Sequence, residues 1–143
     1  MTALVVGLGT PDRGDDGVGP VVAAEVGRCD LPGLHVVRLT APAELLHLVD
    51  GYDSVVVVDA LRSGGVPGRV RVLNARVPGN RAAGTHDLGL AEVVALAREL
   101  GRLPPRFTIV AIEGECFDTG TALSPRVERA VPVAVDAVMT ALE

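Results

Sequence analysis

Five carboxylates and one imidazole are expected at the same edge of the folded chain, where two of the carboxylates and the imidazole could bind a metal ion. They lie beside short apolar segments or in turn-forming loops: Asp15, Asp16, Asp59, His86, Glu113 and Glu115. Two carboxylates and one imidazole make a three-ligand set that leaves positions open for water or a substrate. Such a set suits a borderline divalent ion (zinc, nickel, cobalt, iron or manganese), whereas calcium and magnesium prefer oxygen ligands throughout.

Each of these residues also has an ordinary structural interpretation. Asp16 precedes an expected helix and could favour its positive end, a role for which Asp15 competes. Asp59 ends a wholly apolar strand, where a buried carboxylate costs free energy unless it is paired or metal-bound. His86 could be a solvated loop residue, and Glu115 could equally be solvated. The residues alone leave both interpretations open.

The periodicity of apolar residues predicts strands that alternate with helices. The expected strands cover residues 3–8, 34–39, 54–58, 69–73 and 107–112. The expected helices begin at Val18, cover 42–49 and 88–100, and follow Ser124-Pro125. The consecutive valines at 55–58 indicate burial on both faces, as at the centre of a parallel sheet. The alternation of Arg and Val at 69–72 indicates a half-exposed edge strand.

This alternation predicts an α/β fold, a three-layer sandwich with a mostly parallel five-stranded sheet flanked by helices. The length of 143 residues favours a single domain over residues 1–143. We expect Ser124 to cap the last helix, and Pro132 to kink or divide it. In open α/β sheets, ligands bind outside the carboxyl ends of the parallel strands. The acidic residues and His86 are therefore expected to gather at that edge.

Composition and charge exclude several classes of function. The chain has 13 basic residues, all arginine, and 18 acidic residues, and the resulting net charge of −5 argues against nucleic-acid binding. The absence of lysine removes a Walker A loop and a Schiff-base lysine. Asp12 stands at the third glycine position of a dinucleotide fingerprint and disfavours NAD, and Ser63 lies in no nucleophile elbow. With no signal-peptide pattern and no membrane-length apolar run, we expect a cytoplasmic protein without membrane contact.

Four further residues with reactive side chains are expected to take no part in chemistry. Cys29 and Cys116 form no CxxC pair and have no zinc-finger spacing, so we expect incidental thiols. His35 lies in an expected strand and His47 on a short helix, and both are expected to be structural or exposed. The sequence offers no Ser, Cys or Thr placed beside a base as a nucleophile.

Six short motifs follow one another along nearly the whole chain: VVGLG at 5–9, GDDGVG at 14–19, VVDA at 57–60, THDLGL at 85–90, IE at 112–113 and LSP at 123–125. In this order they resemble the hydrogenase maturation protease family. Members of that family remove a short C-terminal peptide from the large subunit of nickel-iron hydrogenases once nickel has been inserted. The chain departs from the family pattern at Thr10, at residues 39–42 and at Gly114. These departures change the surface expected to bind the peptide and leave Asp16, Asp59 and His86 in place.

The resemblance implies that Asp16, Asp59 and His86 contact the metal. The expected topology also brings these three residues to one edge of the sheet. It implies a metal-dependent endopeptidase whose nickel is carried by the substrate, a hydrogenase large-subunit precursor, with Asp16 and Asp59 as catalytic residues. A metal-polarised carbonyl attacked by metal-bound water would supply the chemistry. Because no nucleophile is evident, a non-hydrolytic metal-dependent maturation chaperone or scaffold of the same fold is the alternative. A small nucleotide-binding domain is disfavoured by Asp12 and by the acidic edge, and the oligomeric state is not predicted.

Overall fold

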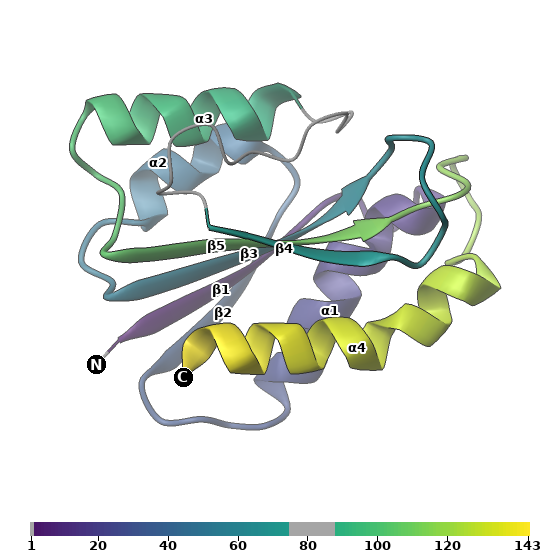
Figure 1. The fold of residues 1–143 in the computed structure, drawn as a ribbon, viewed down its shortest axis with the longest axis horizontal. Helices are drawn as coiled ribbons and strands as arrows, with labels where there is room; N and C mark the ends of the chain where they lie inside the picture. The colour runs from purple at the N-terminus through teal and green to yellow at the C-terminus, as the bar shows by residue number, and fades with distance from the viewer. Residues whose placement is uncertain (1, 75–87) are drawn as a thin grey trace.

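Strands and helices alternate along the chain in the computed structural model, which describes residues 2–74 and 88–143 (Figure 1). The strands are β1 (Ala3–Leu8), β2 (Leu34–Leu39), β3 (Ser54–Leu61), β4 (Val70–Asn74) and β5 (Arg106–Glu113). The helices are α1 (Val18–Gly27), α2 (Leu45–Leu48), α3 (Leu88–Glu99) and α4 (Pro125–Leu142). Two short 3-10 helices, η1 (Gly14–Gly17) and η2 (Pro42–Glu44), precede α1 and α2. No helix among the described residues is long and apolar enough to cross a membrane.

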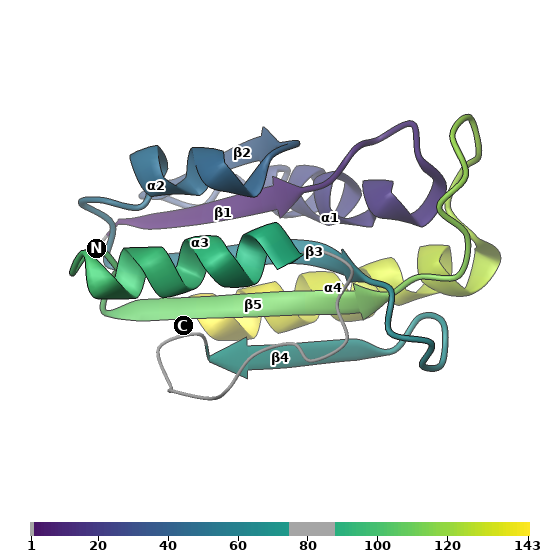
Figure 2. The same ribbon diagram turned by 90° about the horizontal axis from the view of Figure 1, so that it is seen from above.

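The strands form one five-stranded sheet in the order β2-β1-β3-β5-β4. β1, β2, β3 and β5 run parallel, and only β4, at the edge, is antiparallel to its neighbour. α1 and α4 cover one face of the sheet, and α2 and α3 cover the other (Figures 1 and 2). The predicted three-layer α/β fold with a mostly parallel sheet is confirmed.

Each face of the sheet has its own apolar core. β3 is buried along its whole length, as its run of valines predicts, because helices cover both of its faces. Val57 and Leu61 pack on the side of α2 and α3, whereas Val56 and Val58 pack on the side of α1 and α4. Because side chains alternate along a strand, Asp59 lies on the same face as Val57 and Leu61.

Four expectations differ from the observed elements. β3 continues beyond residue 58 to Leu61, so Asp59 lies within the strand and does not follow it. The helix expected over 42–49 is divided into η2 and the short α2. The predicted edge strand is shifted by one residue, to 70–74. Of the two outcomes expected for Pro132, division of the helix is not observed: α4 continues through this proline, with Val127, Ala130, Ala134 and Val138 buried on one face.

The start of α1 lies unusually close to two strands. A Cβ atom at Gly19 would stand 2.5 Å from the carbonyl oxygens of both Leu8 and Val58, so only glycine fits there. The main chain of α1 therefore touches the ends of β1 and β3 directly. This contact fixes where η1, which immediately precedes α1, lies relative to the sheet.

Candidate functional site

Asp16 lies in η1 and is held beside the end of β1. Its carboxylate oxygen Oδ2 accepts a hydrogen bond of 2.8 Å from the main-chain amide of Thr10. A Cβ atom built at Gly9 would lie 3.6 Å from the carboxyl carbon of Asp16, which shows how closely the loop passes the side chain. Gly9 has a φ of +143°, a conformation that side chains other than glycine rarely adopt. The glycine therefore permits the approach that places Asp16 at the strand end.

Asp59 is a buried carboxylate within β3. Asp59 is 5% exposed, and its Oδ1 accepts a hydrogen bond of 2.8 Å from the main-chain amide of Ala60. Its partner across the sheet is Ala111 of β5. A carboxylate in such surroundings costs free energy unless other groups stabilise its charge. An apolar residue would be the stable choice here, so the acid is the exception that needs a reason.

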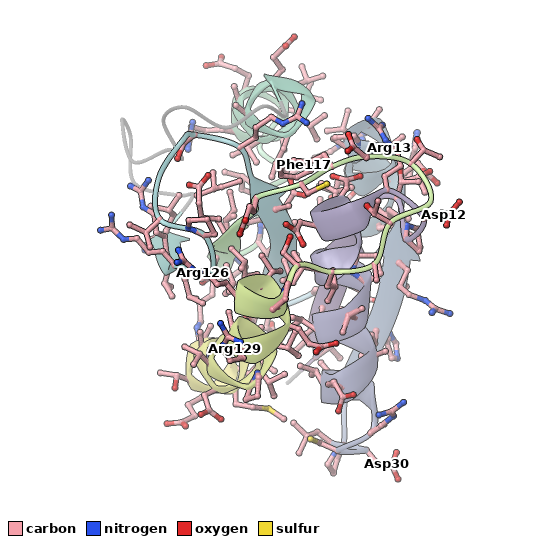
Figure 3. All side chains as sticks on the ribbon, turned by 90° about the vertical axis from the view of Figure 1, so that its right-hand side faces the viewer. Asp12, Arg13, Asp30, Phe117, Arg126 and Arg129 are labelled. Atoms are coloured by element: carbon pink, nitrogen blue, oxygen red, sulfur yellow. The ribbon has the colours of Figure 1, made fainter. Side chains whose placement is uncertain are left out.

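Asp16 and Asp59 come from elements that touch each other. η1 contacts β3, and the close contact at Gly19 joins the start of α1 to Leu8 at the end of β1 and to Val58 of β3. Both carboxylates therefore lie at the carboxyl end of the parallel strands, where ligands bind in open α/β sheets. This end of the molecule faces the viewer in Figure 3.

His86, the third predicted ligand, lies outside the described residues, and so do its neighbours at 75–87. The described helix α3 begins at Leu88 with its first turn toward the end of the molecule where β1, β3 and β5 also end (Figures 1 and 2). Within residues 2–74 and 88–143, no group of three or more His, Cys, Asp or Glu side chains is arranged to hold a metal ion. The three-ligand site therefore stays a prediction, with two of its members placed.

Asp15 is the residue whose importance the sequence did not reveal. It is fully buried, and its carboxylate accepts four hydrogen bonds from the segment between β5 and α4. The donors are the amides of Glu115 (2.7 Å), Cys116 (3.0 Å) and Ser124 (2.7 Å), and the Ser124 hydroxyl (2.7 Å). Asp15 thus ties the loop that carries Asp16 to the loop that follows β5.

These hydrogen bonds also control the charge of Asp15. Burial by itself raises the pKa of this carboxyl, but the hydrogen bonds from Cys116, Ser124 and Glu115 outweigh burial and lower the pKa below its ordinary value. The interpretation of Asp15 as a simple helix cap is wrong, because its partners lie in another segment. The prediction that Ser124 is the N-cap residue of α4 is confirmed, but its hydroxyl donates to Asp15 and makes no capping hydrogen bond to the helix.

Glu113 fixes the loop between β3 and β4. It is the last residue of β5, is 3% exposed, and accepts hydrogen bonds from the Ser63 amide (2.9 Å) and the Ser63 hydroxyl. Its own carbonyl accepts a further bond of 2.8 Å from Gly68. Glu113 therefore lies at the expected edge but positions a loop, and Glu115 is exposed. Ser63 has a structural partner here, which the sequence did not predict.

We expect Ser63→Ala to lower the free energy of unfolding by about 1 kcal/mol, because one hydrogen bond to a buried carboxylate is lost. Urea denaturation followed by circular dichroism measures the change. Val66→Ala in the same loop is the control, because this side chain is 65% exposed. A loss for Ser63→Ala no larger than that of the control would contradict the role of Glu113 in holding the loop.

The other reactive side chains behave as expected. His35 is exposed and its Nδ1 lies 2.7 Å from the hydroxyl of Tyr52, whose ring it meets edge-on. His47 is exposed. Cys29 and Cys116 are free thiols, the first exposed and the second partly buried. At the rim of the site the guanidinium of Arg62 lies 4.3 Å above the centre of the Phe117 ring.

Comparison with known proteins gives a consistent result. A family model described as hydrogenase maturation protease matches residues 40–141. The hydrogenase 2 maturation protease of Escherichia coli (strain K12) is 32% identical, and the match covers 99% of this chain and 91% of that protein. The structure of the hydrogenase maturating endopeptidase HybD from E. coli superposes with a TM-score of 0.82 at 26% identity, covering 99% of this chain and 92% of the other. A solution structure of an endopeptidase from Escherichia coli gives a TM-score of 0.87 at 28% identity, with the same coverage.

Proposed function

The chain belongs to the hydrogenase maturation protease family, and from this premise we propose that it removes the C-terminal extension of a nickel-loaded nickel-iron hydrogenase large-subunit precursor. The observation that supports the proposal is the pair of carboxylates on the touching elements η1 and β3, at the ligand-binding edge of the sheet. Asp16 and Asp59 supply oxygen ligands of the kind that, together with an imidazole, suit a borderline divalent ion. His86 is the proposed imidazole.

In this proposal, nickel is part of the substrate and reports that the precursor is loaded. Asp16 and Asp59 bind the ion, and their main-chain hydrogen bonds from Thr10 and Ala60 keep the carboxylates oriented for it. Binding the ion also places the scissile peptide bond next to it, which gives the rate advantage of a fixed geometry. Water adds to the carbonyl carbon, the C–N bond breaks, and the released amine takes up a proton. A metal ion assists such a hydrolysis by polarising the carbonyl and activating water.

The test is to mix the protein with nickel-loaded and with nickel-free large-subunit precursor and to weigh the products by mass spectrometry. We expect the loaded precursor alone to lose its C-terminal peptide. Binding of the loaded precursor without any loss of mass would instead identify a non-hydrolytic scaffold. Equal cleavage of both precursors would support the peptidase activity but contradict the recognition of nickel.

Metal dependence, an aspartic-type mechanism and a cytoplasmic location belong to the same proposal. Adding a chelator during the reaction with the loaded precursor tests which of the two proteins holds the metal ion. If the nickel is held by the substrate, a chelator that leaves the precursor loaded will not stop cleavage. If the protein needs a metal ion of its own, the same chelator will stop it.

A further inference from the structure

A groove runs between α1 and α4, on the face of the sheet opposite to α3. It has a volume of about 790 Å³. On α1 its wall is formed by Val21 and Glu25, with Cys29 just beyond the helix, at successive spacings of four residues. Figure 3 shows α4 and α1 next to each other, with the segment between β5 and α4 crossing the ends of both. The groove therefore follows one helical stripe of α1.

The opposite wall is one stripe of α4. Its lining residues are Glu128, Val131, Pro132, Val135 and Asp136, which recur at the three- and four-residue spacing of a single helix face. The distance from residue 128 to 136 corresponds to about 12 Å along the helix axis, a little more than two turns. Glu128, Pro132 and Asp136 are exposed along this stripe, whereas Val131 and Val135 are partly buried against the core.

The groove combines an apolar floor with acidic edges. Among the residues that the structure describes, Glu25, Glu128 and Asp136 line the groove and no arginine does. Glu25 is already paired with Arg28 at 2.7 Å, whereas Glu128 and Asp136 form no ion pair with any residue in 2–74 or 88–143. Val21 is 38% exposed, so apolar surface reaches solvent between these charges. The complementary ligand is an apolar helix stripe flanked by basic side chains.

The groove is connected to the candidate site by the chain itself. Leu123, which lines one end of the groove, directly precedes Ser124, and Ser124 bonds Asp15 through both its amide and its hydroxyl. Asp15 in turn is the neighbour of Asp16. A partner seated in the groove is therefore held at a fixed position relative to the carboxylates.

We propose that the groove between α1 and α4 binds an amphipathic, positively charged helix of the hydrogenase large-subunit precursor, and so docks the substrate outside the cleavage site. The identity of the partner rests on the proposed function. The apolar and basic character expected of the partner helix is inferred from the groove alone. A docking surface of this kind strengthens substrate binding without acting on the peptide bond, so its loss raises KM and leaves the chemical step intact.

The first experiment tests the chemistry of the groove without any hydrogenase. Two synthetic peptides of about 14 residues share a leucine stripe at helical spacing and carry either arginine or glutamate beside it. We expect the arginine peptide to bind at least about tenfold more tightly than the glutamate peptide, measured by fluorescence anisotropy. The double variant Glu128→Gln/Asp136→Asn should abolish that preference. The matched control Glu92→Gln/Glu99→Gln removes two exposed charges from α3 and should keep it.

The second experiment uses the nickel-loaded precursor. Glu128→Gln/Asp136→Asn is expected to raise KM about tenfold, which corresponds to about 1.4 kcal/mol of binding free energy, and the α3 control to leave KM unchanged. Val21→Ser should raise KM in the same direction by removing apolar contact. Thermal melting of each variant shows that the fold is kept.

The outcomes separate the two proposals. If the wild type cleaves no precursor, the proposed function is wrong, while the peptide experiment still decides what the groove binds. If the wild type cleaves the precursor but the groove and control variants have equal KM values, the docking proposal is overturned and the proposed function stands. Dissociation of a dimer by the groove variant in gel filtration would also overturn it, because the occupant would then be a second copy of the chain.

Discussion

Replacing Asp59 by asparagine is expected to slow cleavage of the nickel-loaded precursor roughly 10²–10³-fold, the range found when a single group that stabilises developing charge is removed. Asparagine has nearly the shape of aspartate, and its carbonyl oxygen can still accept the hydrogen bond of the Ala60 amide. What it lacks is the negative charge that would bind the ion. The same argument holds for Asp16→Asn and the hydrogen bond from Thr10.

The measurement is the initial rate of peptide release by mass spectrometry, with circular dichroism to show that each variant is folded. Asp12→Asn is the matched control, because Asp12 lies four residues before Asp16 but is exposed at the outer edge of the loop (Figure 3). It should cleave at the wild-type rate. Wild-type activity in either Asp16→Asn or Asp59→Asn would remove that residue from the site.

The layered fold could be predicted because few patterns determine it. The valine run of β3 requires cover on both faces, and strands separated by helical segments favour parallel crossovers, although β4 and β5 pair antiparallel with α3 between them in the chain. Strand order is different, because sequence periodicity says which residues are buried and not which strands are neighbours. The order β2-β1-β3-β5-β4 depends on how the helices pack on the sheet. One such contact, at Gly19, is not predicted by any local sequence pattern.

The end of β3 illustrates a second limit. The apolar run stops at Val58, so the pattern predicts a strand end there, yet β3 continues because β5 supplies main-chain partners as far as Leu61. Hydrogen bonding to a neighbour decides where a strand ends, and the neighbour is unknown at the sequence level. Asp59 was expected directly after the strand, and its position inside the strand could not be predicted from the sequence.

Asp15 marks the largest gap between sequence and structure. Two adjacent aspartates between glycines look equivalent, and both fit the start of a helix. The difference lies in partners more than a hundred positions away, namely Cys116 and Ser124. Only the tertiary fold assigns one carboxylate to holding loops together and leaves its neighbour at the edge of the sheet. The one sequence signal that could have suggested two different roles is the pair of adjacent acids between Gly14 and Gly17.

Asp15→Asn is therefore expected to be the most destabilising of the polar substitutions, with a loss of about 3 kcal/mol in the free energy of unfolding at pH 7. Three donors point at Oδ2 and the Ser124 amide points at Oδ1. In either orientation the carboxamide directs its NH₂ group at a donor, so at least one buried amide loses its acceptor. A loss of this size lowers the melting temperature by roughly 10 °C for a chain of this length. Asp53→Asn is the control, because Asp53 is exposed and accepts one amide hydrogen bond, from Thr2.

The dependence on pH tests whether this stabilisation comes from the carboxylate charge of Asp15. Because the folded state lowers the pKa of Asp15, its stabilising contribution is complete above the ordinary aspartate pKa of about 3.9 and is lost as the pH falls through the lower folded value. The wild type should therefore lose more stability than Asp15→Asn as urea titrations move from pH 7 toward pH 3, and the gap between them should narrow. A gap that stays constant over this range would mean that the carboxylate charge of Asp15 does not hold the two loops together.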